Sequence, residues 1–226
     1  MDWIKVLLRE NFVHLISEPR TGSTAVYNSI NYNLNEQGFN HLNLNEPLSK
    51  LKYKTLTNEV QVLCTYIKNN PKKVKVMKNH AVNIAKLDKE NQSLIFSLPG
   101  KKVALSRKNL FEQACSRAIA EETGVWGQKQ PKTKMNIHVN DFLDRIDECI
   151  EDKKILNQFR KVFDYKIYYE DIVFDSTYSK KNFPKSNIIK NLDELKLFFN
   201  NWIEKNYNKI QHLVPWQKKL EISSHK

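Results

Sequence analysis

Four short apolar runs alternate with helical stretches along this chain, and this alternation restricts its fold more than any other feature. The runs occupy residues 12–16, 74–78, 101–106 and 165–169, and helical patterns occupy about 24–35, 57–68, 109–123, 141–159 and 192–203. Strands that are separated by helices favour right-handed crossovers and a mainly parallel sheet. The sequence therefore predicts an α/β fold, a central sheet flanked by helices, in a single domain.

Boundaries within that domain follow from the same patterns. We expect the core to span about residues 12–210, with 1–11 and 211–226 as terminal extensions. Residues 36–56 are rich in Asn with scattered Leu, which is typical of loop with short turns. In open parallel sheets a ligand lies beyond the carboxyl ends of the strands. The loops to inspect are therefore residues 17–24, 78–81, 106–109 and 170–175.

The charge balance favours an anionic partner. The 226 residues include 37 Lys and Arg against 25 Asp and Glu, a formal net charge of +12. Such an excess suits a nucleic acid, a phosphorylated cofactor or an anionic surface. No apolar run approaches the roughly 18 residues of a membrane span, and the first ten residues are too interrupted for a signal segment. We therefore expect a cytoplasmic protein without a membrane span.

Cysteine and histidine spacing argues against a metal site. Cys64, Cys115 and Cys149 lie far apart, so we expect three packed, reduced thiols. His14 lies within an apolar run, which indicates a core histidine. The aromatic residues that recur at helical spacing, and are therefore expected in the core, are Phe142, Phe159, Phe199 and Trp202.

The strongest local motif is Ser17-Glu18-Pro19-Arg20-Thr21-Gly22-Ser23-Thr24, between an apolar run and a helical pattern. Backbone amides around a glycine at a helix start can cradle an anion, and the guanidinium of Arg20 adds a planar fork. A plain capped helix start is the simpler alternative. A nucleotide triphosphatase loop needs Lys after its last glycine, and Ser23 stands there. The motif therefore predicts an anion site that works without a metal.

Two further strand ends carry chemistry. Arg107 follows the run 101–106, and Ser116 lies about two helical turns later, so together they suit a second phosphate. Lys78 ends the run 74–78, and His80 lies two residues beyond it. A histidine titrating near neutral pH suits proton removal, and Lys78 would add charge to a transferring group. Solvated surface charges remain the alternative at each of these positions.

At this point the motifs resemble a family, the sulfotransferases that use 3′-phosphoadenylyl sulfate (PAPS) and release the bisphosphate PAP. Residues 17–24 resemble the family's 5′-phosphosulfate loop, and residues 103–116 resemble its 3′-phosphate motif. Glu122-Thr123-Gly124-Val125-Trp126 is similar to a segment of the bacterial trehalose sulfotransferase branch, and Tyr169-Glu170-Asp171-Ile172-Val173 resembles a widespread strand end. The matches fall in one order over residues 12–175. The resemblance implies a P-loop-like fold, a PAPS donor, a hydroxyl acceptor, of which a carbohydrate is one candidate, and no metal.

The resemblance also implies residue roles. Arg20 would meet the sulfuryl group and the bridging oxygen, and Tyr169 would lie near the adenine. The 5′-phosphate would be bound by Thr21, Gly22, Ser23 and Thr24. The 3′-phosphate would be bound by Ser116 with Arg107, although the family's usual spacing points to Lys108 instead of Arg107.

For the general base, the resemblance and the residues leave two candidates. Glu46, followed by Pro47, resembles the place where the trehalose branch carries a catalytic glutamate. His80 is the rival.

The acceptor walls are expected at residues 36–56 and 124–139, and the basic run 180–185 is either a solvated loop or a cover for the 3′-phosphate. The alternative functions are a basic nucleic-acid-binding protein and a small-molecule kinase with a degenerate phosphate loop; we expect no nucleic-acid partner.

Overall fold

The computed structural model describes residues 2–39, 41–50, 56–70, 73–124, 133–174, 185–214 and 220. The chain divides into two compact units. The first comprises Met1–Ser106 and Asp152–Ser179, and the second comprises Arg107–Glu151 and Lys180–Lys226. Among the described residues, no helix is both long enough and apolar enough to cross a membrane.

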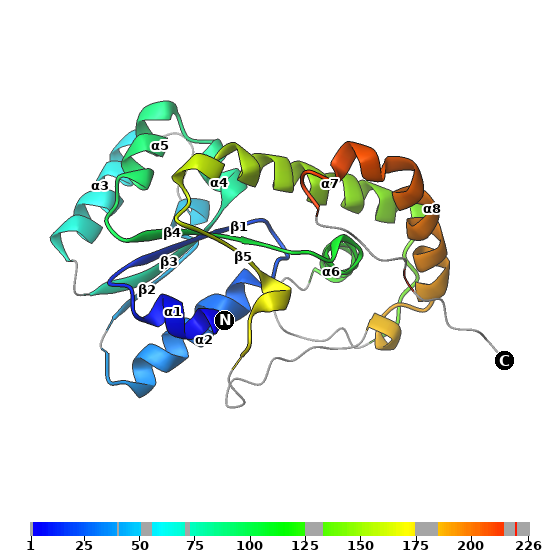
Figure 1. Ribbon diagram of the computed structural model, residues 1–226, viewed down its shortest axis with the longest axis horizontal. Helices are drawn as coiled ribbons and strands as arrows, with labels where there is room; N and C mark the ends of the chain where they lie inside the picture. The colour runs from blue at the N-terminus through cyan, green and yellow to red at the C-terminus, as the bar shows by residue number, and fades with distance from the viewer. Residues whose placement is uncertain are drawn as a thin grey trace. The chain divides into compact units, whose positions relative to one another are not determined.

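The first unit is built on one sheet of five parallel strands in the order β2-β3-β1-β4-β5 (Figure 1). The strands are β1 (Val13–Ser17), β2 (Leu42–Asn45), β3 (Val74–His80), β4 (Lys101–Ser106) and β5 (Tyr165–Tyr168). The α/β fold predicted from the alternating pattern is confirmed. The four predicted apolar runs nearly coincide with β1, β3, β4 and β5.

Strand β2 corrects the prediction of loop over residues 36–56. Leu42-Asn43-Leu44-Asn45 alternates apolar and polar residues, which is the period of a strand. Four residues make a weak pattern, and Asn is depleted in strands, so the signal is easily missed. The strand forms because it pairs with β3 at the edge of the sheet, with Asn45 opposite Lys78.

Helices cover both faces of this sheet (Figure 1). One face packs Val13 and Leu15 against α1 (Trp3–Leu8) and α2 (Ser23–Glu36), and α1 adds a helix within the expected terminal extension. The other face packs Ile16 and Met77 against the remaining helices of the unit. Those helices are α3 (Leu56–Asn69), α4 (Ala81–Ala85), α5 (Lys89–Phe96) and the end of α7 (Val139–Gln158).

The second unit is helical and has its own apolar core. It contains α6 (Leu110–Thr123), the first part of α7 and α8 (Leu192–Ile210). Phe111 stands at the centre, with its ring centroid 5.4 Å from those of Phe142 and of Phe199. Cys115 and Cys149 are buried in this core, and Cys64 is buried in the first unit, as expected for packed cysteines.

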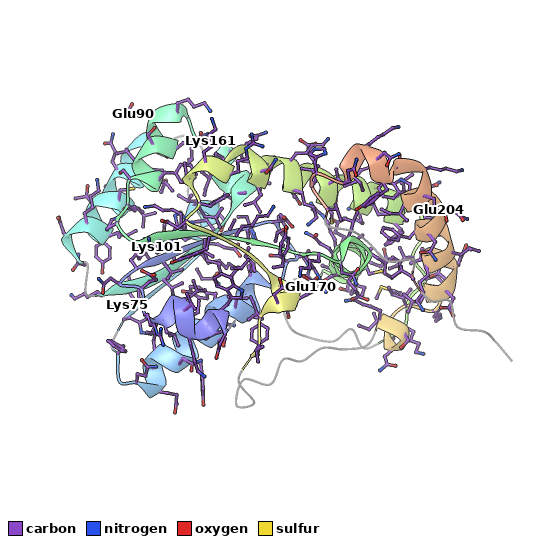
Figure 2. All side chains as sticks on the ribbon, viewed as in Figure 1. Lys75, Glu90, Lys101, Lys161, Glu170 and Glu204 are labelled. Carbon is purple, nitrogen blue, oxygen red and sulfur yellow. The ribbon has the colours of Figure 1, made fainter. Side chains whose placement is uncertain are left out.

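The strand order identifies where a ligand is expected in the first unit. From β1 the chain passes to β2 and β3 on one side, whereas β4 leads to β5 on the other. Ligands of open α/β sheets bind beyond the carboxyl ends of the strands at such a switch point. Figure 2 labels a residue at each end of the parallel strands: Lys101 begins β4, and Glu170 lies just past the carboxyl end of β5.

Candidate functional site

The loop between β1 and α2 has a strained backbone. Gly22 has a φ of 82° and Arg20 a φ of 62°, both in the left-handed region. Among the described residues, Arg20 and Glu46 are the non-glycine residues with positive φ. Such conformations persist where the surroundings enforce them, and they cluster at ligand sites. Two of the four residues predicted to be catalytic, Arg20 and Glu46, therefore have this strain, and Lys78 and His80 do not.

Helix α2 begins without a side-chain cap. Its N-cap is Gly22, which has no side chain to bond the first backbone amides. The simpler alternative, a helix start capped by Ser or Thr, is therefore not what the structure contains. A helix N-terminus of this kind presents N–H groups and the positive end of the helix dipole, an arrangement that suits an anion.

The loop hydroxyls differ in their surroundings. Thr21 is buried, and its hydroxyl donates to the backbone oxygen of Glu18 at 2.9 Å. Because the hydroxyl proton is used in that bond, which closes the turn, Thr21 would have to bind a phosphate through its backbone. Thr24 is exposed, and its hydroxyl accepts a hydrogen bond from Lys78 Nζ at 2.9 Å. Ser23 is buried at the start of α2.

Tyr169 packs against the loop glycine. It follows β5 and is 7% exposed, and a Cβ built on Gly22 would lie 2.3 Å from its Cε2 atom. No side chain larger than hydrogen fits at position 22 unless that ring moves. The structure thus places Tyr169 at the loop between β1 and α2, where it supports the loop backbone.

A buried ion pair anchors the start of the same loop. Glu18 and Lys153 have side chains that are 1% and 2% exposed, and Lys153 Nζ lies 2.9 Å from Glu18 Oε2. Ser106, at the end of β4, donates to Glu18 Oε1 at 2.6 Å. Buried charges of this kind are retained when they are paired and hydrogen-bonded. The pair ties the ends of β1 and β4 together beside the loop.

Sequence reasoning did not single out Lys153 or Ser106 for a role. A signal for Lys153 existed, because it continues the apolar stripe of α7 formed by Phe142, Ile146 and Ile150. A lysine at such a position indicates a buried partner. Nothing in the local sequence identifies Glu18 as that partner, since the two residues meet only through the fold.

Four residues from three strand ends form one polar network beside Thr24. Lys78 Nζ lies 2.6 Å from Glu46 Oε1, and His80 Nε2 lies 3.1 Å from the same oxygen. His80 Nδ1 faces Ser17 Oγ at 3.1 Å. Of Lys78, Glu46 and His80, Lys78 is the most deeply buried, with a side chain that is 1% exposed. The three residues named for acid–base and charge roles are thus in direct contact, next to the loop.

The network holds Glu46 as a carboxylate. The hydrogen bond from His80 is the largest cause, and with that from Lys78 it lowers the pKa of Glu46 from 4.5 to about 2, although burial acts in the opposite direction. Both contacts use Oε1, and among the described residues the structure gives Oε2 no donor. Both ring nitrogens of His80 face protein groups. Glu46 is therefore the candidate base with an available atom, and His80 is placed to orient it.

The residues expected at a second phosphate lie in the second unit. Arg107 and Lys108 precede α6, whose N-cap Asn109 accepts from the backbone amide of Glu112 at 3.0 Å. Arg107 Nη2 is 3.9 Å from Glu112 Oε2, and Ser116 is half-buried on α6. This cap confirms the predicted helix start. The choice between Arg107 and Lys108 stays a prediction.

Some predicted features fall outside the described residues. Trp126 and the neighbouring residues 125–132 belong to the expected acceptor wall, and residues 180–184 belong to the basic run.

Comparison with known proteins adds no family: no protein-family model matches the chain, and no curated protein matches it. The geometry and the chemistry of the named residues therefore carry the functional conclusion.

Proposed function

We propose that this protein is a sulfotransferase that moves a sulfuryl group from 3′-phosphoadenylyl sulfate to an acceptor hydroxyl without a metal ion. The observation that carries the proposal is the contact between the loop after β1 and the proposed base. Lys78 Nζ bonds both Thr24 Oγ1 of the loop and Glu46 Oε1. One buried ammonium thus lies between an anion-binding motif and a carboxylate, which is what transfer from a charged donor to a neutral alcohol requires.

On the donor side, the residues of the loop bind and stabilise negative charge. The amides at the start of α2 and the Arg20 guanidinium would bind the 5′-phosphosulfate and the charge that develops on its bridging oxygen. Lys78 would add a cation at the transferring group. Fixed donors of this kind are worth about 10²- to 10³-fold in rate each.

On the acceptor side, Glu46 takes the proton. The acceptor oxygen forms a bond to sulfur while the bond between sulfur and the bridging oxygen breaks, and the acceptor proton passes to Glu46 Oε2. His80 holds Oε1 and keeps the carboxylate oriented. Because the sulfur–oxygen exchange is in line, the two sides of the site act on opposite faces of the sulfuryl group.

A carboxylate with a pKa near 2 is a weak base, and Lys78 offers a way to strengthen it. The same ammonium bonds the loop through Thr24. An anion held by the loop attracts this positive charge and weakens its stabilisation of Glu46, which raises the basicity of the carboxylate. The base would thus be strongest when the donor is bound.

Arg107 and Ser116 remain the residues proposed for the 3′-phosphate, with Lys108 as the alternative to Arg107. This part of the proposal rests on the motif resemblance and on charge. It predicts that Arg107→Ala lowers affinity for 3′,5′-adenosine bisphosphate but changes affinity for adenosine 5′-phosphosulfate little. If Lys108→Ala has that effect instead, the assignment moves to Lys108.

The direct test is transfer of label from ³⁵S-labelled donor to a panel of carbohydrate and phenolic hydroxyls, in the presence of a chelator. We expect labelled product from the wild-type protein and none above background from Arg20→Ala or Glu46→Ala. Only Arg20→Ala should also weaken binding of the desulfated nucleotide. If Glu46→Ala keeps its activity, the base is His80.

Two binding experiments separate the rival functions. A thermal-shift panel of 3′,5′-adenosine bisphosphate, ATP, and ATP with Mg²⁺ should give stabilisation by the bisphosphate. Stabilisation only by ATP with Mg²⁺ would favour a kinase. Salt-sensitive binding to arbitrary DNA without any shift from the bisphosphate would favour a nucleic-acid-binding protein.

A further inference from the structure

Asn79 stands between Lys78 and His80 on β3 but belongs to the opposite face of the sheet. Successive side chains of a strand point to opposite faces, so Asn79 shares its face with Met77 and, across β1, with Ile16. Its side chain is fully buried. It therefore does not reach the atoms that Lys78 and His80 contact, and its role must act through another residue.

The amide of Asn79 has a partner at each end. Its Oδ1 accepts from the backbone amide of Leu48 at 3.2 Å, and its Nδ2 lies 3.2 Å from His14 Nε2. Burial, followed by the charge of Lys102, lowers the pKa of His14 to about 3, so the ring is neutral at physiological pH. A neutral ring can accept the Asn79 amide proton at Nε2, and this fixes which end of the amide faces Leu48.

The bond to Leu48 holds the turn that carries Glu46. Glu46 has a φ of 51°, an unfavourable value for a residue with a side chain. Its backbone amide donates to the Lys78 carbonyl at 2.7 Å, and the amide of Ser49 closes the turn on the Glu46 carbonyl at 3.1 Å. Leu48 itself is buried in the apolar cluster on that face. The turn is thus attached to β3 before and after Pro47.

We infer that Asn79 is a positioning residue that holds the strained Glu46 turn so that the carboxylate stays within reach of Lys78 and His80. Without the Leu48–Asn79 bond, the turn keeps its attachment at Lys78 but loses the one beyond Pro47, and Glu46 is free to relax toward ordinary φ values. Any effect on sulfuryl transfer rests on the proposed function, whereas the placement of the carboxylate does not.

The test is a carboxyl titration of Glu46 by ¹³C NMR, with Glu46→Gln used to assign its resonance. Lys78 and His80 from β3 are the charged and titratable groups that face this carboxylate. In Asn79→Leu, which keeps the volume and removes both hydrogen bonds, we expect the Glu46 pKa to rise from about 2 toward its ordinary 4.5. Asn79→Ser serves as the second variant if the leucine variant does not fold.

A matched control separates positioning from general loss of stability. Asn91 on α5 is also fully buried, and its side chain donates to Asp88 Oδ2 at 2.9 Å, away from the network. Asn91→Leu should leave the Glu46 titration at its wild-type value. A Glu46 pKa that stays near 2 in both Asn79 variants, or that rises equally in Asn91→Leu, overturns the inference.

Activity separates this inference from the proposed function. If both hold, Asn79→Leu lowers kcat by on the order of 10²-fold, the cost of a misplaced catalytic group, with unchanged affinity for 3′,5′-adenosine bisphosphate. If the Glu46 titration shifts in the Asn79 variants but the wild type transfers no sulfuryl group, the positioning role stands and the proposed function is overturned. If the wild type transfers the sulfuryl group but the Glu46 titration does not shift in the Asn79 variants, the proposed function stands and the positioning role is overturned.

Discussion

The two units differ in what they bury. Of the described residues, the buried polar and charged side chains belong to the first unit, with Gln113 as the exception in the second. The second unit instead packs aromatic and aliphatic side chains, and its ion pairs lie nearer the surface. Burying polar groups is unfavourable unless each is bonded, so a fold that gathers them does so for a reason beyond packing. The difference supports the proposal that the chemistry lies in the first unit, where the buried polar groups include Glu18, Lys78 and Asn79.

The largest contrast is expected between two ion pairs of equal length. Lys153 to Glu18 and Lys196 to Asp193 both span 2.9 Å, but the first pair is 2% and 1% exposed and the second 19% and 26%. Lys153→Met leaves the buried Glu18 carboxylate without its lysine partner and should lower the free energy of unfolding by about 3–5 kcal/mol. Lys196→Met should change it by about 0–1 kcal/mol. Denaturant unfolding measures the free energy of unfolding of both variants. Equal losses of that free energy would contradict the difference between the units.

The next contrast lies along β3. Lys78 at the carboxyl end contacts Glu46 and the loop. Lys75, which Figure 2 labels, is near the amino end, and its Nζ lies 5.4 Å from the centroid of the Phe39 ring. Lys78→Met should lower the rate of sulfuryl transfer about 10²- to 10³-fold, because a fixed cation at the developing charge is lost. Lys75→Met should leave the rate unchanged. Equal rates for the two variants would place the chemistry elsewhere.

A smaller contrast concerns two glycines with similar backbone. Gly22 and Gly38 have φ values of 82° and 76°, but a Cβ at Gly22 meets the Tyr169 ring at 2.3 Å and one at Gly38 meets nothing within 4 Å. An alanine at either position would therefore have similar backbone strain, but only the alanine at position 22 would clash with a neighbouring side chain. Gly22→Ala should be less stable than Gly38→Ala by about 1–3 kcal/mol, measured by thermal unfolding. It should also weaken binding of the bisphosphate, which Gly38→Ala should not.

The last contrast is the pH dependence of stability, over two windows that overlap only between about pH 3 and 4.5. The pKa of His14 is lowered from 6.5 to about 3, so its contribution is present above pH 6.5 and is lost as pH falls toward 3. The pKa of Glu46 is lowered from 4.5 to about 2, so its contribution is present above pH 4.5 and is lost toward pH 2. His14→Gln should flatten the stability curve below pH 6.5, and Glu46→Gln only below pH 4.5. A change between pH 4.5 and 6.5 in Glu46→Gln, or no change there in His14→Gln, would contradict these assignments.

The sequence was sufficient for most of the fold, and physical reasons explain the exception. Four strands have short apolar patterns that the sequence shows clearly, and Asn109 marks the start of α6. Strand β2 was missed because Asn at two of its four positions weakens the pattern, and pairing with β3 supplies what local preference lacks.

The candidate site was predicted residue by residue but not as a network. Arg20, Lys78 and His80 stand at strand ends, which the parallel topology brings to one edge. The residue pairs beside the site, Glu18–Lys153 and Asn79–Leu48, are distant in sequence and meet only through the fold. The left-handed backbone at Arg20 and Glu46 was also beyond the sequence, because neither residue type indicates it.

The central claim is that the loop after β1 binds the nucleotide without a metal. Calorimetric titration of 3′,5′-adenosine bisphosphate into the wild-type protein, with a chelator present, tests it most directly. The account predicts one site per chain, lost in Arg20→Ala and kept in Glu46→Gln. No heat of binding, or binding that appears only with Mg²⁺ and survives Arg20→Ala, would contradict it.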